Sequence, residues 1–193
     1  MKLVFATNNA HKLEEARQIL APDVEIIGMQ EAGYTEDIDE TGVTLEENAL
    51  LKARTVYKAT GLSCFADDTG LEVDALDGRP GVYSARYAGP GHDFSANVDK
   101  LLTELNNKTN RKARFRTSVC LILDGKEFFF DGIVNGEIQH ERSGNGGFGY
   151  DPVFRPEGYQ LSFAELSADA KNAISHRGRA LGQLRKFILH PAD

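Results

Sequence analysis

Two long runs of strand-forming residues, joined only by Asp124 and Gly125, constrain the fold of this chain more than any other feature. The first run reads ARFRTSVCLILD and the second KEFFFDGIVNGEIQ. Both contain many β-branched and aromatic residues, and Asp-Gly is a strong signal for a two-residue hairpin turn. The sequence therefore predicts a long antiparallel hairpin, long enough to extend as a second lobe.

The first sixty residues alternate strands with helices. KLVFAT (residues 2–7) and VEIIGM (residues 24–29) are short apolar runs typical of buried strands. The helix between them is indicated by the apolar positions Leu13, Ala16, Ile19 and Leu20. A second helix is expected from about Thr44, which forms a capping-box pattern with Glu47, to a stop at Gly61. Together with the hairpin, this alternation predicts the α/β class with a mixed sheet.

The rest of the chain continues with both kinds of element. LSCFAD and LEVDAL are expected as two strands on either side of a turn at DDTG, residues 67–70. Helical spacing predicts a helix near residues 98–105 and a closing helical stretch from about Ala168 to His190, interrupted near Ser175. The glycine-rich segment GNGGFGYDPVFRPEG is too irregular for a regular element. With no repeat or linker, the 193 residues are expected to form one domain.

Composition narrows the class of protein and its partners. The 41% hydrophobic and 26% charged residues are those of a soluble globular protein, and no apolar run approaches the length of a membrane span. Because the start, MKLVFATNNAHK, reaches polar residues too soon for a signal peptide, a cytoplasmic protein is expected. Cys64 and Cys120 lie in apolar runs and are expected to be buried free thiols.

The net charge of −7 argues against a nucleic-acid-binding surface. A polyanionic partner such as a triphosphate would then require a local concentration of positive charge or a bridging divalent cation.

The stretch FADDTG places two carboxylates, Asp67 and Asp68, directly after an apolar run. Adjacent carboxylates lose hydration and repel unless a cation or hydrogen-bond donors offset the cost, and Mg²⁺ is commonly held by one or two carboxylates with substrate phosphates. Neighbouring strand residues point to opposite faces, so one of the pair is expected to face a given ligand. The alternative is an Asx-type turn in which Gly70 adopts positive φ.

Two further stretches have both a structural and a functional interpretation. In TNNAHK, Thr7, Asn8 and Asn9 can cap the first helix, or the strand-to-helix turn and Lys12 can bind phosphate. In DIDETG, Glu40 is either a partner of the next helix dipole or a metal ligand.

The second half of the chain offers groups suited to a nucleobase. In GGFGYDP, Phe148 and Tyr150 have rings that can stack on a base, and Asp151 can accept an N–H from a base edge; a tight loop packed by its own aromatics is the alternative. In SADAKNAISHRGRAL, Lys171 belongs to a basic run that is typical of a solvated helix face. Arg177, by contrast, shares an apolar stripe and therefore requires a buried anion or carbonyl.

In their order along the chain, these stretches resemble the pattern of the inosine triphosphate pyrophosphatase family. The matching blocks are TxNxxK, ETGxTxxENAxxKA, ADDTGLEVDALxGxPGVYSARYAG, GGFGYDPxF and KNAxSHRGxAL, and they cover nearly the whole chain. The sequence departs from the pattern in TNNAHK, where many members carry a glycine, and at Thr69, where serine is common. A bulkier first loop could alter the affinity for phosphate.

The resemblance implies a mixed, elongated central sheet flanked by helices, with two lobes, a substrate cleft between them and a homodimer. It implies Mg²⁺-dependent hydrolysis of dITP, ITP and XTP to the monophosphate and pyrophosphate. It assigns Asp68 as proton acceptor and Glu40 and Asp68 as metal ligands, while Asp67 is either a second ligand or a structural cap. The residues expected to contact substrate are Thr7, Asn8, Asn9, Ala10, His11, Lys12, Lys52, Thr69, Phe148, Gly149, Tyr150, Asp151, Lys171, His176 and Arg177.

Base choice has a physical basis in this assignment. Hypoxanthine and xanthine present an O6 acceptor and an N1–H donor, whereas adenine presents the reverse. An acceptor such as Asp151 and donors such as His176 and Arg177 would be left unpaired by adenine, which can discriminate by about 10⁴-fold. Two alternatives remain at this stage: a pyrophosphatase for other modified nucleotides, and a nucleotide sensor without hydrolysis.

Overall fold

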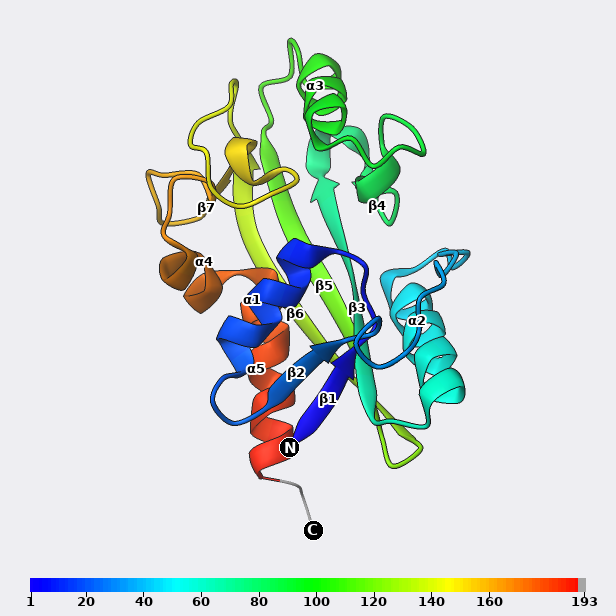
Figure 1. Cartoon of the computed structure of the whole chain (residues 1–193). Helices are drawn as coiled ribbons and strands as arrows, with labels where there is room; N and C mark the ends of the chain where they lie inside the picture. Colours follow the sequence, from blue (N-terminus) through cyan, green and yellow to red (C-terminus); the bar gives the residue numbers. More distant parts are fainter. Residues whose placement is uncertain (191–193) are drawn as a thin grey trace. The chain divides into compact units, whose positions relative to one another are not determined.

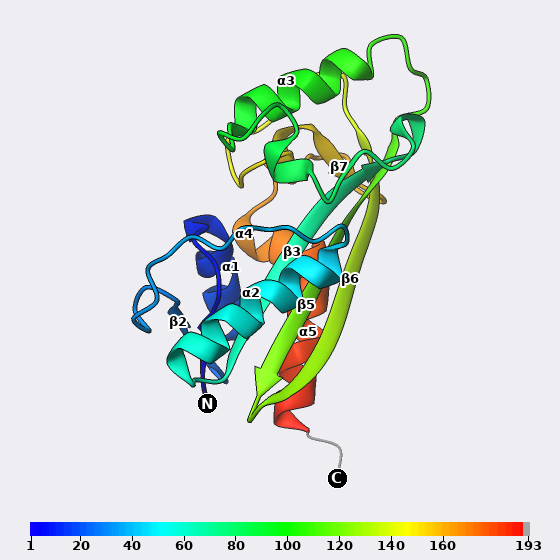
Figure 2. The same ribbon diagram turned by 90° about the vertical axis from the view of Figure 1, so that its right-hand side faces the viewer.

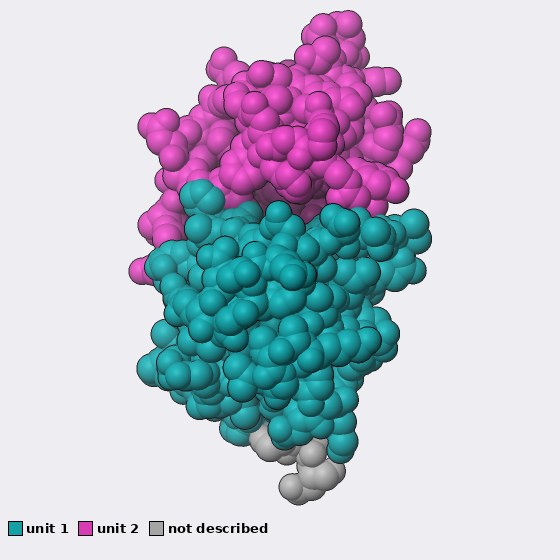
Figure 3. All heavy atoms as spheres, turned by 45° about the vertical axis from the view of Figure 1, so that its right-hand side comes forward, with its two compact units in different colours: residues 1–68, 117–132, 177–193 teal, residues 69–116, 133–176 magenta. Residues whose placement is uncertain are grey.

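The computed structural model describes residues 1–190 as two compact units (Figure 3). Among the described residues, unit 1 contains residues 1–68, 117–132 and 177–190. Unit 2 contains residues 69–116 and 133–176. No helix within residues 1–190 combines the length and the apolar character needed to cross a membrane.

A mixed sheet flanked by helices confirms the predicted α/β class (Figure 1). The strands are β1 (Lys2–Phe5), β2 (Glu25–Gly28), β3 (Cys64–Val73), β4 (Pro80–Gly81), β5 (Lys112–Leu123), β6 (Lys126–Ile138) and β7 (Phe154–Pro156). The helices are α1 (Ala10–Leu20), α2 (Leu45–Thr60), α3 (Phe94–Glu104), α4 (Ala168–Ile174) and α5 (His176–Leu189). The strand order is β2-β1-β3-β5-β6-β7, and β4 pairs with β3.

Unit 1 is layered because its strands alternate buried side chains between two faces. One face carries Phe5 and Phe65, whose rings stack at 4.3 Å, and packs against α1 and α5. The other face carries Cys64, Ala66 and Cys120 and packs against α2. Figures 1 and 2 show α2 on one side of these strands and α5 on the other. Both faces of these strands are therefore covered by helices, which explains the near-continuous apolar runs of β1 and β3.

The connections of unit 1 create a topological switch point. Strands β2 and β3 both pair parallel with β1, on opposite sides of it. Helix α1, which joins β1 to β2, packs on one face, whereas α2, which joins β2 to β3, packs on the other. In open α/β sheets, ligands bind beyond the carboxyl ends of the strands at such a reversal. The fold thus directs attention to the residues after β1 and to the part of β3 just beyond its pairing with β1, where Asp67 and Asp68 lie.

Local signals predicted α2 closely. The N-cap is Thr44, whose hydroxyl accepts from the backbone N–H of Glu47, and Gly61 ends the helix in the left-handed conformation. The reciprocal bond of the predicted capping box differs, because the Glu47 carboxylate accepts from the N–H of Val43. The predicted hairpin is also confirmed, with positive φ at Asp124 and Gly125 between β5 and β6.

Unit 2 has its own core on one side of its strand segments. Leu71 and Val73 of β3 and Phe115 of β5 contribute to it, together with Leu101 of α3 and Phe154 of β7. The closing helical stretch is interrupted as predicted, since Ser175 is the C-cap of α4 and α5 begins at His176.

The predicted turn at DDTG is wrong, because β3 runs without interruption from Cys64 to Val73. Gly70 has ordinary strand geometry and permits a close approach: a Cβ there would lie 2.7 Å from the backbone oxygen of Gly81. The two carboxylates need no turn, since side chains from the flanking helices neutralise or hydrogen-bond them inside the sheet.

Both thiols are free and buried, as expected from the sequence. Burial raises the pKa of each, Cys64 and Cys120, to about 12. Since the thiolate is the reactive form, we predict that iodoacetamide at pH 8 leaves both thiols of the native protein unmodified and alkylates both after unfolding in urea. Intact mass spectrometry would count the adducts, and rapid labelling of the native protein would contradict the prediction.

Candidate active site

The pleat of β3 sends Asp67 and Asp68 to opposite faces of unit 1. Asp67 shares the face of Phe65 and meets α1 and α5, whereas Asp68 shares the face of Ala66 and meets α2. Both side chains are buried. The expectation that only one of the pair faces a given ligand follows directly from this alternation.

Asp67 is held by cations on both of its oxygens. Its Oδ1 lies 3.0 Å from Lys12 Nζ and its Oδ2 lies 2.8 Å from Arg177 Nε, while its backbone oxygen accepts from Lys52 Nζ at 2.6 Å. Arg177 also pairs with Glu15. Burial raises the pKa of Asp67, but Lys12, Arg177 and Lys52 outweigh it and hold the pKa well below 3.8. Asp67 is thus an ionised structural anchor.

Asp68 lies in a different electrostatic environment. Its Oδ2 accepts a 2.9 Å hydrogen bond from Asn48 Nδ2, a side chain of α2. Burial and the charge of Glu40 raise its pKa, while Lys52, Lys12 and the Asn48 hydrogen bond act in the opposite direction; the net pKa is raised. A carboxylate with a raised pKa is a stronger base than an exposed one, which is the property that proton abstraction requires.

Lys52 pairs with Glu40 and lies close enough to Asp68 for each charge to affect the other's pKa. Its Nζ lies 2.8 Å from Glu40 Oε1, and its ammonium is almost fully buried. Burial lowers the pKa of Lys52, but Glu40, Asp68 and Asp67 outweigh it and raise the pKa. Burial raises the pKa of Glu40, yet Lys52 brings it below its usual value. Both groups are therefore charged at neutral pH.

The residues present fit a cation with octahedral coordination by oxygen, such as Mg²⁺, better than a metal site whose ligands are all protein side chains. Within residues 1–190, no group of three or more His, Cys, Asp or Glu side chains could hold a metal ion by itself. Glu40 and Asp68 offer carboxylate oxygens close enough for the charge of one to raise the pKa of the other. One or two carboxylates, completed by waters and substrate phosphates, are the usual protein ligands of Mg²⁺.

The turn after β1 serves as the cap of α1. The side chain of Asn9 accepts from the N–H groups of His11 and Lys12, and Thr7 Oγ1 accepts from Asn9 N–H. Asn8 donates to Asp37. Ala10 and His11 are exposed at the start of the helix. Capping of α1 is confirmed for Asn9, and phosphate binding by this turn stays a prediction. The positive end of α1 lies at the carboxyl ends of β1 and β2.

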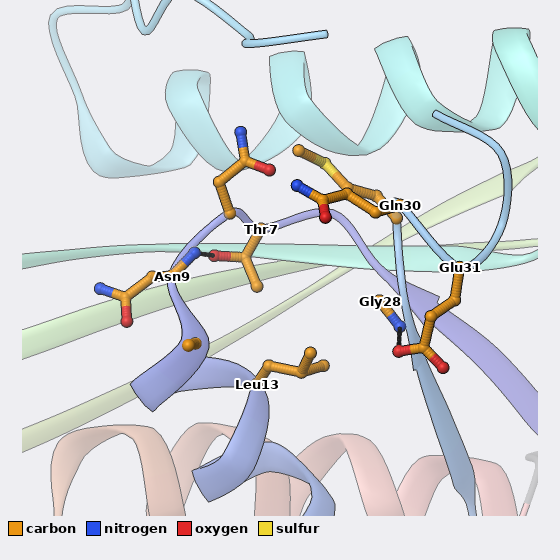
Figure 4. A pocket seen from close by; sticks show the side chains of 9 residues that line it. Thr7, Asn9, Leu13, Gly28, Gln30 and Glu31 are labelled. Atoms are coloured by element: carbon orange, nitrogen blue, oxygen red, sulfur yellow. Dashed lines mark hydrogen bonds between the residues drawn. The ribbon is translucent and has the colours of Figure 1, made fainter. Parts of the chain in front are cut away.

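A hollow of about 170 Å³ opens beside this turn (Figure 4). The turn and Leu13 of α1 line one part, and the segment 28–31 after β2 lines the rest. Figure 4 shows the Gly28 N–H bound to the Glu31 carboxylate at its rim. The hollow therefore lies at the carboxyl ends of β1 and β2, and neither Lys52 nor Asp68 lines it.

Unit 2 gathers a second group of predicted site residues. Lys171 Nζ lies 2.6 Å from Asp151 Oδ2, and both side chains are buried. The same oxygen accepts from the N–H of Phe148, which fixes the glycine-rich loop. Lys171 Nζ also lies 4.9 Å from the centroid of the half-buried Phe148 ring. A cation, a carboxylate and an aromatic face are thus assembled within one unit.

The other predicted residues of unit 2 have defined structural roles. Tyr150 is buried in the core, and its hydroxyl donates to the backbone oxygen of Ser84 at 2.7 Å. His176 is buried, with its ring stacked 4.6 Å from Phe115. Gly149 adopts positive φ within the loop, and Thr69 is half-buried next to Asp68 in β3. Of the two predicted stacking rings, Phe148 is the one with exposed surface.

Two buried side chains of unit 1 were not assigned to the site from the sequence. Asn48 contacts Asp68, and Glu15 pairs with Arg177. Asn48 is buried, as is Lys52 four residues later in the same helix. The signal available for Asn48 was its spacing of four residues from Lys52, which puts both side chains on one face of the helix. No local pattern marks Glu15.

The charge of Asp67 should stabilise the fold. In Asp67→Asn, Lys12 and Arg177 lose their shared anion, and breaking a buried pair costs about 3 kcal/mol of unfolding free energy. Urea unfolding at pH 7 would measure the loss. The control is Asp131→Asn, an exposed carboxylate on β6, where the change should stay within about 0.5 kcal/mol. Equal effects of the two substitutions would contradict the anchoring role.

Comparison with known proteins places the chain in a family. The model of the Ham1 family matches residues 3–187. A dITP/XTP pyrophosphatase of Porphyromonas gingivalis is 59% identical over 189 residues, 97% of each chain, and one of Flavobacterium psychrophilum is 51% identical over 97% of this chain and 99% of its own. The solved Ham1 protein of Staphylococcus aureus is 42% identical, with a TM-score of 0.87 over 98% of each chain. These findings confirm the resemblance inferred from the motifs, and the chain belongs to the Ham1 family.

Proposed function

We propose that this protein is a nucleoside-triphosphate pyrophosphatase that hydrolyses dITP, XTP and ITP to the monophosphate and pyrophosphate. The observation that carries the proposal is the buried Asp68 carboxylate, which Asn48 hydrogen-bonds and which lies near the ion pair of Lys52 with Glu40. The names of the relatives, which match over nearly their full length, support the same activity. Removal of such nucleotides from the pool is the expected role.

Unit 1 binds the triphosphate in this proposal. Lys12 and Lys52 supply positive charge within a protein of net charge −7, and the first turn of α1 supplies its positive end. Fixed cations act chiefly by stabilising charge that develops on the phosphates during transfer. The buried ion pairs hold these cations in place before the substrate arrives.

We propose Mg²⁺ as the cofactor, with Glu40 and Asp68 as the residues that would hold it. Bound there with the substrate, the cation would neutralise phosphate charge and polarise the phosphoryl oxygens. The supporting observation is the donor set: two neighbouring carboxylates suited to a cation that completes its shell with phosphate oxygens and water.

Asp68 acts as the proton acceptor. Its carboxylate can take the proton of an attacking water, and the hydrogen bond from Asn48 holds Oδ2 in place. A purely structural role suits Asp67 better than Asp68, because Asp67 is the carboxylate paired with Lys12 and Arg177.

Unit 2 selects the base. The ring of Phe148 is proposed to stack on the purine, and Lys171 provides a donor for the 6-keto oxygen. Asp151 Oδ2 already accepts from Lys171 and from Phe148 N–H, and a carboxylate has further lone pairs with which to accept an N–H from the base. His176 and Arg177 remain proposed substrate contacts by resemblance. Adenine, with the reversed donor and acceptor, would leave these buried groups mismatched.

Homodimer formation and a cytoplasmic location are also proposed for this chain, both carried by the family resemblance. The ranking among dITP, ITP and XTP depends on groups around the 2-position and the ribose.

A product assay tests the proposed activity. Purified protein with Mg²⁺ is given dITP, ITP, XTP, GTP and ATP separately, and pyrophosphate and orthophosphate are measured independently. We expect pyrophosphate from the first three and little product from GTP or ATP. Orthophosphate as the primary product would place the attack on a different phosphorus and refute the reaction; binding without turnover would favour a sensor.

The nearly isosteric Asp68→Asn variant tests the proton acceptor. We expect kcat to fall by at least about 10²-fold, because the amide cannot take a proton and general-base catalysis contributes about 10²–10⁴-fold. The melting temperature should stay close to that of the wild type, since Asn48 still has an oxygen to bind. Turnover close to that of the wild type would remove Asp68 from this role.

A further inference from the structure

We propose that Asn48 is a positioning residue for the reaction: its buried side-chain amide fixes both the Asp68 carboxylate and the loop that carries Glu40. The inference rests on the proposed hydrolysis, in which Asp68 accepts the proton of water. Asn48 itself is assigned no contact with substrate, so its effect must pass through the groups that it holds.

One amide connects two separate segments of unit 1. Asn48 lies in the first turn of α2 and has no exposed surface. Its Nδ2 donates to Asp68 Oδ2 at 2.9 Å, and its Oδ1 accepts from the backbone N–H of Gly42 at 2.8 Å. The side chain therefore joins β3 to the 40–42 segment through the rigid start of a helix.

The two contacts fix which end of the amide faces the catalytic carboxylate. A backbone N–H can only donate, so the Gly42 contact requires the oxygen of Asn48 at that position. The NH₂ group must then point at Asp68, and a flipped amide would place oxygen against carboxylate and N–H against N–H. The contact with Gly42 therefore sets the orientation in which the amide donates to Asp68.

The 40–42 segment is shaped around this amide. A Cβ at Gly42 would lie 2.6 Å from Asn48 Oδ1 and 3.0 Å from Asn48 N, so a side chain there would displace the contact. Glu40 is tied to the same helix one turn later, through Lys52 at 2.8 Å. Helix α2 thus orients both carboxylates proposed to hold the cation.

Neither of the closest alternatives to asparagine reproduces the arrangement. Aspartate keeps the shape and the acceptor for Gly42, but it sets a second carboxylate at hydrogen-bond distance from Asp68. Leucine keeps the volume, but it leaves the Gly42 N–H and the Asp68 oxygen without their partner. Asparagine is suited to the position because it donates on one side and accepts on the other.

The chain contains a matched control in Asn97 of α3. Asn97 is also buried, accepts from the N–H of Ala88 at 2.8 Å and donates to the oxygen of Ala85 at 3.0 Å. It belongs to unit 2 and contacts none of the carboxylates proposed for catalysis. The Asn97→Leu substitution therefore removes one accepted and one donated hydrogen bond of a buried amide, as Asn48→Leu does, without changing a contact of Asp68.

The experiment compares Asn48→Leu, Asn48→Asp and Asn97→Leu with the wild type, using ITP as substrate and α,β-imido-ITP as a non-cleavable ligand. We expect kcat to fall by about 10- to 100-fold in both Asn48 variants, as for other residues that orient catalytic groups, with analogue affinity changed by less than about threefold. Asn97→Leu should lower the melting temperature comparably and leave kcat unchanged. Wild-type kcat in Asn48→Asp, or equal kcat in the two leucine variants, would overturn the proposal.

A readout without turnover separates this inference from the proposed function. In ¹H–¹⁵N spectra, the Asn48 side-chain amide should be protected from solvent exchange, and Asp68→Ala should remove that protection. An unprotected amide in an active enzyme would reject the positioning role alone. A protected amide in a protein that releases no pyrophosphate would reject the proposed function alone.

Discussion

The pleat of β3 is the constraint on which the rest of the site depends. Because consecutive strand residues face opposite sides, Asp67 and Asp68 are buried among different partners although they are neighbours in the chain. Asp67 is paired on both oxygens by Lys12 and Arg177 and stays ionised. Asp68 receives a neutral donor, Asn48, and keeps a raised pKa. A single strand therefore provides a structural anion on one face and the proposed base on the other.

Local sequence signals predicted those elements whose cause is local. The cap at Thr44, the stop at Gly61 and the Asp124-Gly125 turn are each decided by a few adjacent residues, and all three are confirmed. DDTG was predicted as a turn for the same local reasons, and there the prediction was wrong. The charge of Asp67 is satisfied by partners 55 and 110 residues away, and Asp68 is hydrogen-bonded by Asn48, 20 residues away; no local pattern contains these contacts.

The candidate site was predictable in its residue types and less so in their roles. Motif order identified the residues that cluster in unit 1 and those that cluster in unit 2. The division of labour within a cluster depends on burial: Tyr150 was expected to stack on the base but belongs to the core, and Phe148 keeps the exposed ring surface. Asn48 escaped assignment because its importance comes from the two groups that it joins.

The sum of charges in the cluster around Asp67 and Asp68 explains why its cations alone do not make a triphosphate site. Lys12, Lys52 and Arg177 contribute three positive charges, and their carboxylate partners Glu15, Glu40 and Asp67, together with Asp68, contribute four negative ones, which leaves three minus four, or −1. The carboxylate partners hold these cations in fixed positions but cancel most of their charge. The cations can therefore orient a triphosphate, but they give the cluster no net attraction for it. A divalent cation bound between these carboxylates and the phosphates would reverse that sign. The ion pairs that stabilise unit 1 are thus themselves an argument for the proposed magnesium.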